Sequence, residues 1–548
     1  MVKVRSILSG FLILSILGTG CEKLLEVDSD QLVLPENHKL DSPDEIGYSI
    51  IGITSQLEKI AERYVLLGEL RGDLMRVTEV AGSDLREISN FTISADNPYN
   101  RPSDYYTIIN NCNYVIRNID TSIVSNAEKI MYREYAAAKA FRAWTCMQVA
   151  LNYGKVIYFE EPLLYIEDSD NSFPEYSIYE LAPVLIQELE PLKIIPPVEP
   201  ISLGQDLTSE NLFFPVRLLL GELYLWMGSY EKAAREYHDL MLLGGHLVTD
   251  SYRSVWNVIN GVFTDYRPLW SDIFDLNSGD EEKITMIAGS TEYGQGSGLD
   301  SLVYAFEIAP SIIALDHWDN QLYYHSSSTV NPGDLRKMSS VYQGLVEGYN
   351  PFAEPDEALQ EGMIGKYLNM STPTSKAIHI YRSGLLYLRF AEAINRAGKP
   401  NTAFAVLKNG MNERTFLIDS ITPAREKFVS LTDSTLIDYL DFSDPLFDRN
   451  IGVHSRGCGL IYFSPDFKIP NLPTLEDSIE YVETKILEEL ALETAFEGNR
   501  FQDLMRIADR RSDPACLADR VSAKYDPGMQ EALRSKLMDR NNWFLPLE

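Results

Sequence analysis

The sequence predicts a mainly α-helical protein built from helix hairpins, with a large irregular portion. Hydrophobic residues recur every three or four positions in several segments, which is typical of helices with one buried face. Two blocks, at 215–243 and 390–407, space small and large residues as tetratricopeptide helix pairs do. Between these blocks, residues 246–380 lack this periodicity and are rich in turn-forming residues. We therefore expect one fold in which helix hairpins surround a loop-rich middle.

The first expected helix begins after Ser42. Ser42 is a suitable cap, Pro43 suits the first turn, and Glu45 completes the pattern of a capping box. A hydrophobic stripe at Ile46, Ile50 and Leu57 continues this helix. Two more helices are expected near 103–119 and 136–153. The second has a buried face formed by Ala140, Ala143, Trp144, Met147 and Leu151.

The block at 215–243 carries the clearest local pattern. Its spaced residues are Leu220, Gly221, Tyr224, Gly228, Tyr230, Ala233 and Tyr237. In a tetratricopeptide repeat, small residues lie where two helices touch and large residues fill the gaps between them. Arg217 stands where such repeats prefer Trp, and Gly245 stands in place of the closing Pro. A more degenerate second copy runs from Phe390 to Leu407, which predicts hairpins distributed through the fold instead of a continuous solenoid.

The loop-rich portion, 246–380, contains half of the chain's six tryptophans, Trp256, Trp270 and Trp318. Gly, Ser, Asn and Asp interrupt it, as in the run Gly294–Gly298. Such composition predicts loops with occasional short strands. Recognition residues often lie on loops that a rigid scaffold supports, so this portion is where we expect ligand contacts.

Residues 1–20 have the features of a secretion signal. Lys3 and Arg5 are followed by an apolar stretch from Ile7 to Leu17 and by small residues before Cys21. This stretch is shorter than the roughly 20 residues that a membrane-spanning helix needs. Two processing routes are open: ordinary cleavage, which leaves a soluble protein, or attachment of lipid to Cys21, which anchors it. Under the second route, 21–41 is a tether and 42–548 is the body.

The charge argues against nucleic acid as a partner. The chain has 80 acidic and 48 basic residues, a net charge of −32, and such a charge repels phosphate backbones. The remaining cysteines, at 112, 146, 458 and 516, form no CxxC pair and lie near no His at metal-ligand spacing. We therefore expect no disulfide framework, no metal and no cofactor.

Catalytic motifs are absent from the sequence. There is no HExxH, no GxSxG and no P-loop. A glycoside hydrolase needs only two suitably placed carboxylates, and these cannot be singled out among 80 acidic residues. We expect the protein not to be an enzyme, while a secreted hydrolase stays an alternative that product release would reveal.

Several short patches occur in one order along the chain. They are Tyr105-Tyr106-x-x-Ile109, Ala138–Ala143 with Asn152-Tyr153-Gly154, the block at 215–241, Asp334-Leu335-Arg336, Ala391–Gly398, Glu488–Glu493, Phe496–Arg506 and Asn541–Pro546. Taken in this order, they resemble the SusD/RagB family of Bacteroidetes surface lipoproteins. The irregular residues before Cys21 and the missing repeat Pro depart from the family's pattern.

The resemblance implies a single SusD-like fold with four tetratricopeptide-like hairpins, which we place near 103–155, 209–245, 380–412 and 478–511. It implies non-catalytic binding of a nutrient, a glycan or in some members a peptide, and delivery to a SusC-like TonB-dependent outer-membrane barrel. The protein would then be lipid-anchored at the cell surface through Cys21. A helical-repeat adaptor that binds another protein is the alternative from a different class. Within the family patches, we expect Arg142, Glu392 and Glu497–Arg500 to support the scaffold.

Candidate ligand residues follow from what a sugar requires. Aromatic side chains offer flat surfaces to the C–H faces of sugar rings, and nearby amides or carboxylates bind hydroxyl groups. In predicted non-helical segments these residues are Tyr99, Trp270, Tyr293, Trp318, Tyr323 and Tyr324, with Asp96, Asn100 and Asn320 as hydrogen-bonding partners. The alternative is that these aromatic residues close the core beneath long loops.

Overall fold

The computed structural model describes most of the chain from Lys39 to Leu547. The described ranges are 39–125, 128–204, 207–259, 262–267, 269–274, 281–290, 298–326, 329–330, 333–342, 362–368, 375–457, 462–463 and 465–547. The expected signal, Cys21 and most of the expected tether lie outside them. Within these ranges, no helix has both the length and the hydrophobicity to cross a membrane.

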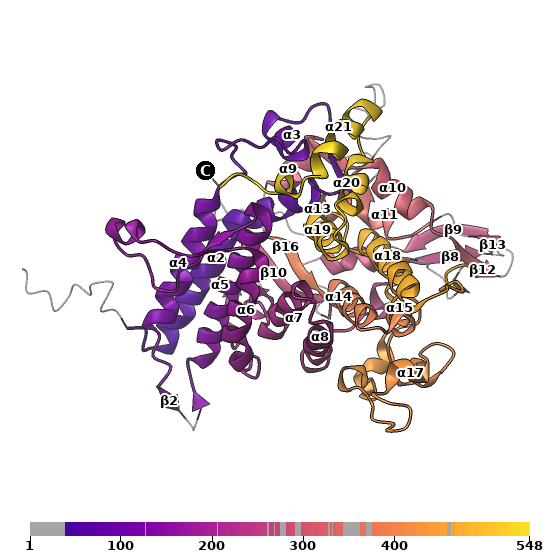
Figure 1. Cartoon of the computed structure of the whole chain (residues 1–548), viewed down its shortest axis with the longest axis horizontal. Helices are drawn as coiled ribbons and strands as arrows, with labels where there is room; N and C mark the ends of the chain where they lie inside the picture. Colours follow the sequence, from indigo (N-terminus) through magenta and orange to yellow (C-terminus); the bar gives the residue numbers. More distant parts are fainter. Residues whose placement is uncertain are drawn as a thin grey trace, which may run out of the picture.

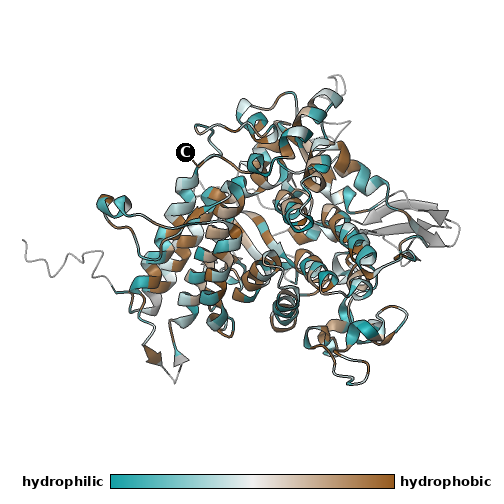
Figure 2. Cartoon of the chain, in the orientation of Figure 1, coloured by the Kyte–Doolittle hydropathy of each residue, from teal (hydrophilic) through white to brown (hydrophobic). Residues whose placement is uncertain are grey.

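A series of helices packed side by side forms the body of the molecule (Figure 1). In this series each helix contacts the next. Its members are α2 (Pro43–Glu69), α4 (Pro102–Asn118), α5 (Tyr132–Tyr153), α6 (Ile178–Leu189), α7 (Val216–Trp226), α8 (Tyr230–Gly244), α14 (Ser383–Arg396), α15 (Pro400–Lys408), α18 (Leu475–Glu493) and α19 (Arg500–Arg511). Figure 2 shows hydrophobic and hydrophilic residues in alternating stretches along these helices, as expected when one face is buried. The prediction of a mainly α-helical protein is confirmed.

Shorter helices and strands complete the fold. The helices are α3 (Ser83–Ser89), α9 (Leu299–Tyr304), α10 (Ile312–Asp319), α11 (Lys337–Ser340), α13 (Gly365–Leu368), α16 (Glu413–Leu417), α17 (Ala424–Lys427), α20 (Ala515–Ser522) and α21 (Pro527–Leu537). The antiparallel strand pairs are β1 (Met75–Val77) with β11 (Ile308–Pro310), β2 (Val124–Ser125) with β3 (Glu128–Lys129), β4 (Val156–Ile157) with β5 (Glu175–Tyr176), β6 (Ser202–Gly204) with β7 (Leu207–Thr208), β8 (Val255–Ile259) with β9 (Val262–Arg267), β10 (Lys283–Ser290) with β16 (Ser375–Arg382), and β14 (Val341–Tyr342) with β15 (Met363–Ile364). A three-stranded sheet has the order β13 (Thr329–Val330), β12 (Tyr323–Ser326) and β17 (Tyr462–Phe463).

The β10–β16 ladder joins the loop-rich portion to the helices. Ile287 pairs with Ile378 and Met286 with His379. Figure 1 shows the ladder at the centre, between the early helices and the late ones. Its side chains are largely buried, so segments of the middle portion help to form the core.

Helix starts follow their sequence signals with one difference. Helix α2 begins at Pro43 after Ser42, but the Ser42 side chain forms no capping hydrogen bond. A reciprocal capping box forms instead at α6, where the Ser177 amide and hydroxyl both donate to the Glu180 carboxylate at 2.9 and 2.8 Å. This box fixes the first turn of α6 and the position of Tyr179 within it.

The α7–α8 pair shows why the repeat-like block needs its small residue. A Cβ atom added to Gly221 would lie 2.4 Å from the ring of Tyr237. The Tyr237 hydroxyl then donates to Glu222 at 2.8 Å, and both residues are buried. Glycine thus lets the two helices approach closely enough for the tyrosine ring to fill the space between them.

A buried ion network ties the middle portion to α18. It consists of Glu282, Asp334, Arg336, Lys366, Arg382, Arg456, Glu489, Glu493 and Glu497. Glu493 is at its centre and accepts hydrogen bonds from Arg382 at 2.6 Å, Arg336 at 2.7 Å and Arg456 at 2.9 Å. These four side chains are at most 1% exposed. Buried charges are tolerated only when paired in this way.

Two of the family-like patches meet at the end of α5. Gly154 ends the helix with φ of +81°, and the ring of Phe544 packs against it. The Leu545 amide donates to the Asn152 carbonyl at 2.9 Å. Arg71 donates to the Trp543 carbonyl at 3.0 Å and to the Asn152 side chain. The C-terminal segment therefore closes over the junction of α2 and α5 as part of the scaffold.

Candidate functional site

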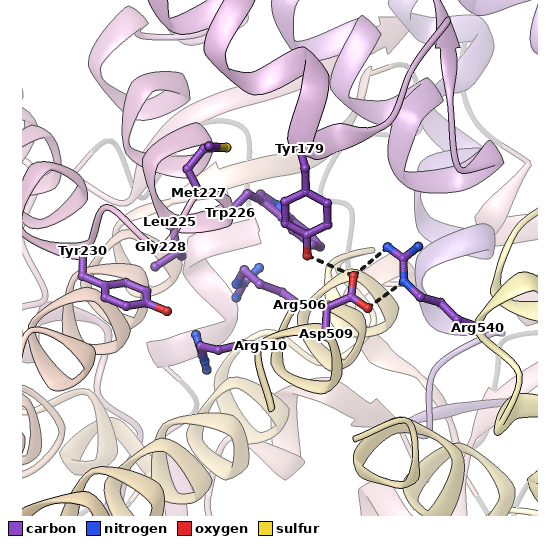
Figure 3. Close-up of a pocket in the computed structure, with 10 residues that line it drawn as sticks. All are labelled: Tyr179, Leu225, Trp226, Met227, Gly228, Tyr230, Arg506, Asp509, Arg510 and Arg540. Carbon is purple, nitrogen blue, oxygen red and sulfur yellow. Dashed lines mark hydrogen bonds and ion pairs between the residues drawn. The ribbon is translucent and has the colours of Figure 1, made fainter. Parts of the chain in front are cut away.

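A cavity of about 430 Å³ opens among the helices of the body. Its walls come from four separate parts of the chain: the start of α6, the turn between α7 and α8, the last turns of α19, and the 3₁₀ helix η11 (Arg540–Trp543). The lining residues are Tyr179, Leu225, Trp226, Met227, Gly228, Tyr230, Arg506, Asp509, Arg510 and Arg540 (Figure 3). We call it the α6–α19 cavity.

One wall of the α6–α19 cavity is held in place by Asp509. Arg540 donates to both oxygens of this carboxylate at 2.7 Å, and the Tyr179 hydroxyl donates to it at 3.0 Å. Figure 3 shows Tyr179 and Arg540 reaching Asp509 from opposite sides. The hydrogen bond to Asp509 raises the pKa of Arg540, while burial and then the charge of Asp509 raise the pKa of Tyr179. The phenol therefore stays neutral, and its ring is fixed at the cavity edge with 38% of the residue exposed.

Beside Tyr179, the lining of the cavity combines aromatic and cationic groups. The Trp226 ring lies edge-on to that of Tyr179, with centroids 6.2 Å apart at an angle of 73°. The Arg506 guanidinium lies 5.7 Å from the Trp226 centroid and donates to Glu392 at 3.0 and 2.7 Å. Burial opposes the charge on Arg506, but Glu392 and Asp503 outweigh that effect and raise its pKa. Both rings are therefore held in fixed orientations.

The arginines of the cavity are already neutralised. Arg510 donates to Glu392 at 2.8 Å and also pairs with Glu483, and Arg506 and Arg540 have the carboxylates described above. The site thus presents the exposed Tyr179, the half-buried Tyr230, exposed Met227, and fixed polar groups with little uncompensated charge, with buried Trp226 behind Tyr179. This arrangement suits a neutral polyhydroxylated ligand, which needs a flat apolar surface and nearby hydrogen-bonding groups.

Three of the aromatic residues predicted to bind a ligand are buried instead. Trp270, Trp318 and Tyr323 are each 0% exposed. The Trp318 indole donates to the Leu492 carbonyl at 3.2 Å, and the Tyr323 hydroxyl donates to Asp334 at 2.9 Å. Trp270 packs against Phe274 and lies under the Lys366 ammonium. These rings close the core beneath the loops and offer no surface to a ligand.

The other predicted positions are distributed over the molecule. Asn100 is buried, and its side chain donates to the Ser94 and Pro546 carbonyls at 3.2 and 3.1 Å, which is a structural role. Tyr99 is half-buried against the core, while Asp96 and Asn320 are exposed. Tyr293 lies outside the described residues. Tyr324 pairs in β12 with Val330 and Tyr462, and its side chain is likewise outside the description. Among the described side chains, those of Tyr99, Asp96, Asn100 and Asn320 do not line the α6–α19 cavity.

Several residues that line the cavity belong to sequence patterns that indicate a structural role. Trp226, Gly228 and Tyr230 belong to the repeat-like block, and Arg506 ends a family-like patch, and both patterns indicate scaffold residues. Tyr179 follows a capping Ser and had no distinguishing pattern. Tyr179 and Asp509 are 330 residues apart in the sequence. The packing of α19 against the α6–α7 end brings them together.

Comparisons with known proteins place the fold. No protein-family model matches the sequence, and no curated protein matches it significantly. Solved structures match over most of the chain. A SusD-like carbohydrate-binding protein from Bacteroides fragilis has a TM-score of 0.55 at 15% identity, with 85% of this chain and 86% of that chain covered. A SusD superfamily protein from Bacteroides vulgatus reaches 0.58 at 14% identity, with 90% and 93% covered.

The chain has the SusD-like fold. A laminarin-binding SusD-like protein also matches, with a TM-score of 0.51 at 18% identity and with 92% of this chain and 96% of that chain covered. The resemblance that the ordered sequence patches indicated is confirmed at the level of the fold. The matches span almost the whole SusD-like body, including both the helical series and the middle portion.

Proposed function

We propose that this protein binds a carbohydrate at the cell surface without cleaving it and delivers it to a SusC-like TonB-dependent barrel. The observation that carries the proposal is the SusD-like fold over about nine-tenths of the chain, shared with proteins described as carbohydrate-binding and laminarin-binding. A binding protein of this kind raises the local concentration of its ligand beside the transporter.

The α6–α19 cavity supports the proposal as the place of binding. Tyr179 supplies an exposed aromatic edge, Tyr230 adds a half-buried second ring, and Asp509 with Arg540 supplies fixed hydrogen-bonding groups. Because these groups are held before the ligand arrives, little conformational entropy is lost on binding. A sugar ring stacked on Tyr179 would have its hydroxyl groups within reach of the Asp509–Arg540 pair.

Anchoring through Cys21 is the second part of the proposal. The described chain begins with Lys39, and Leu40 forms backbone hydrogen bonds of 2.9 and 3.1 Å with Asn118 and Asp120. This attachment fixes the start of the body at the end of α4. Residues 22–38 then suffice to connect a lipid-bearing Cys21 to the body. Mass spectrometry of the mature N-terminus tests the modification.

A glycan panel tests the binding function. Residues 22–548 are titrated calorimetrically with neutral oligosaccharides, β-glucans such as laminarin oligosaccharides included, and each mixture is then analysed for new reducing ends. We expect saturable binding of at least one oligosaccharide and no product. Release of product would contradict the non-catalytic role. Binding of peptides alone would move the ligand class to peptides and overturn the carbohydrate assignment.

A further inference from the structure

A second cavity, of about 390 Å³, lies on another side of α18 and α19. It is bounded by α10, α18, the first residue of α19, and α20. Its polar lining includes Asp73, His317, Glu488, Arg500, Asp519 and Arg520. We call it the α10–α20 cavity. It shares no lining residue with the α6–α19 cavity.

Every carboxylate that lines the α10–α20 cavity already has a cationic partner. Asp73 receives two hydrogen bonds from Arg500, at 2.6 and 2.8 Å. Glu488 pairs with Lys485 at 2.7 Å, and Asp519 pairs with Arg534 at 2.6 Å. The negative charges of the lining are therefore compensated by residues of the protein itself.

Arg520 is the lining charge without a counterpart. Its Nη1 donates to the Cys516 carbonyl at 2.7 Å, but no carboxylate of the described residues lies within 4.0 Å of its guanidinium. Burial and then the charge of Arg500 lower the pKa of Arg520, as expected for a cation that is partly desolvated beside another cation. A guanidinium presents five N–H donors in a planar fork, which matches the two oxygens of a carboxylate.

The rest of the lining suits the body of a small ligand. His317 is half-buried, and burial and then the charge of Arg500 lower the pKa of its ring, which favours the neutral form. No described residue forms a hydrogen bond with this ring, which can therefore donate or accept one toward the cavity. Ile313, Leu487 and Ala523 add an apolar wall. The volume is within the range of small-molecule sites.

We propose that the α10–α20 cavity is a second binding site, independent of the carbohydrate cavity, which takes a small molecule through its carboxylate group. Arg520 binds the carboxylate, and His317 contacts a neighbouring polar group of the ligand. Two kinds of nutrient carry such a group: a uronic acid, as in an acidic oligosaccharide, and the C-terminus of a short peptide.

Matched probes distinguish these sources. The ectodomain is titrated with D-glucuronic acid against glucose, and with N-acetyl-alanyl-alanine against its C-terminal amide, so that each pair differs in the carboxylate. We expect the charged member of at least one pair to bind and its neutral partner to bind at least about tenfold more weakly. Glucuronate binding alone indicates an acidic sugar, and binding of the acetylated dipeptide alone indicates a peptide. Raising the salt concentration should weaken the binding.

Variants locate the binding. Arg520→Gln should weaken binding of the carboxylate probe about tenfold or more. Arg520→Lys keeps the charge but loses the planar fork of donors, so its affinity should lie between those of Arg520→Gln and the wild type. Arg414→Gln removes an equal charge from an exposed position on α16 and should bind as the wild type does. Neutral oligosaccharide binding should be unchanged in Arg520→Gln, which separates this site from the proposed function. The proposal is overturned if no carboxylate probe binds the wild type at millimolar concentration, or if Arg520→Gln and Arg520→Lys both bind it undiminished.

Discussion

Replacing Glu493 with Gln is expected to lower the free energy of unfolding by about 3–5 kcal/mol, the range for breaking a buried ion pair. Its carboxylate accepts hydrogen bonds from Arg336, Arg382 and Arg456, all within 2.6–2.9 Å and all buried. Gln removes the charge that compensates three guanidinium groups and turns an amide N–H₂ toward some of these donors. Chemical denaturation followed by circular dichroism measures the change.

The matched control is Glu476→Gln on the same helix. Glu476 is 64% exposed and pairs with Arg396 at 3.3 Å, and an exposed ion pair contributes at most about 1 kcal/mol. Equal effects of the two substitutions would show that the buried network does not stabilise the junction of α18 with the middle portion.

The same network predicts how stability depends on pH. Burial alone would raise the pKa of Glu493, but Arg382, Arg456 and Arg336 outweigh it and hold that pKa well below 4.5. Because the folded-state pKa is below that of the unfolded chain, this stabilisation is complete above pH about 4.5 and is lost as the pH falls further. The wild type should therefore lose stability more steeply below pH 4.5 than Glu493→Gln does.

Replacing Tyr179 with Ala is expected to weaken binding of the carbohydrate about tenfold or more. Aromatic residues at the centre of a binding site are typical hot spots, and a loss of 1.4 kcal/mol corresponds to a factor of ten. The residue is 38% exposed at the cavity edge, so truncation removes a stacking surface while leaving the packed core of α6 in place. Calorimetric titration with the best oligosaccharide of the panel gives the dissociation constant.

Two further variants separate the possible causes. Tyr179→Phe keeps the ring but loses the hydrogen bond to Asp509, and we expect it to retain most of the affinity if stacking dominates. Tyr304→Ala removes a ring that is 54% exposed on α9 and does not line the cavity, and it should bind as the wild type does. Undiminished binding by Tyr179→Ala would contradict the proposal that the carbohydrate binds in the α6–α19 cavity.

The fold class could be predicted because helical periodicity and the repeat-like block are local signals. Gly221, for example, was identified as a helix-contact position, and the structure places it against Tyr237. The pattern could not show which charged residues converge. Arg336 and Glu493 are 157 residues apart, and nothing in the spacing of either indicates that they meet.

The candidate site was harder to predict, for a physical reason. Aromatic residues in loop segments serve equally well to bind a ligand or to close a core, and Trp318 and Tyr323 do the second. Tyr179 lies on a helix, where an aromatic residue is normally buried, yet it is 38% exposed at the edge of a cavity that α19 and η11 help to line, whereas Trp226 beside it is buried. Tertiary packing, which no local pattern encodes, therefore decides which aromatic residues are available.

Hydrogen–deuterium exchange with and without the best-bound oligosaccharide tests the central claim most directly, because it locates the ligand on the intact protein. The account predicts slower exchange in segments 177–182, 225–232 and 540–545 when the oligosaccharide is bound. Protection confined to 246–380, with exchange in these three segments unchanged, would contradict binding in the α6–α19 cavity. It would indicate instead that the loop-rich portion binds the ligand.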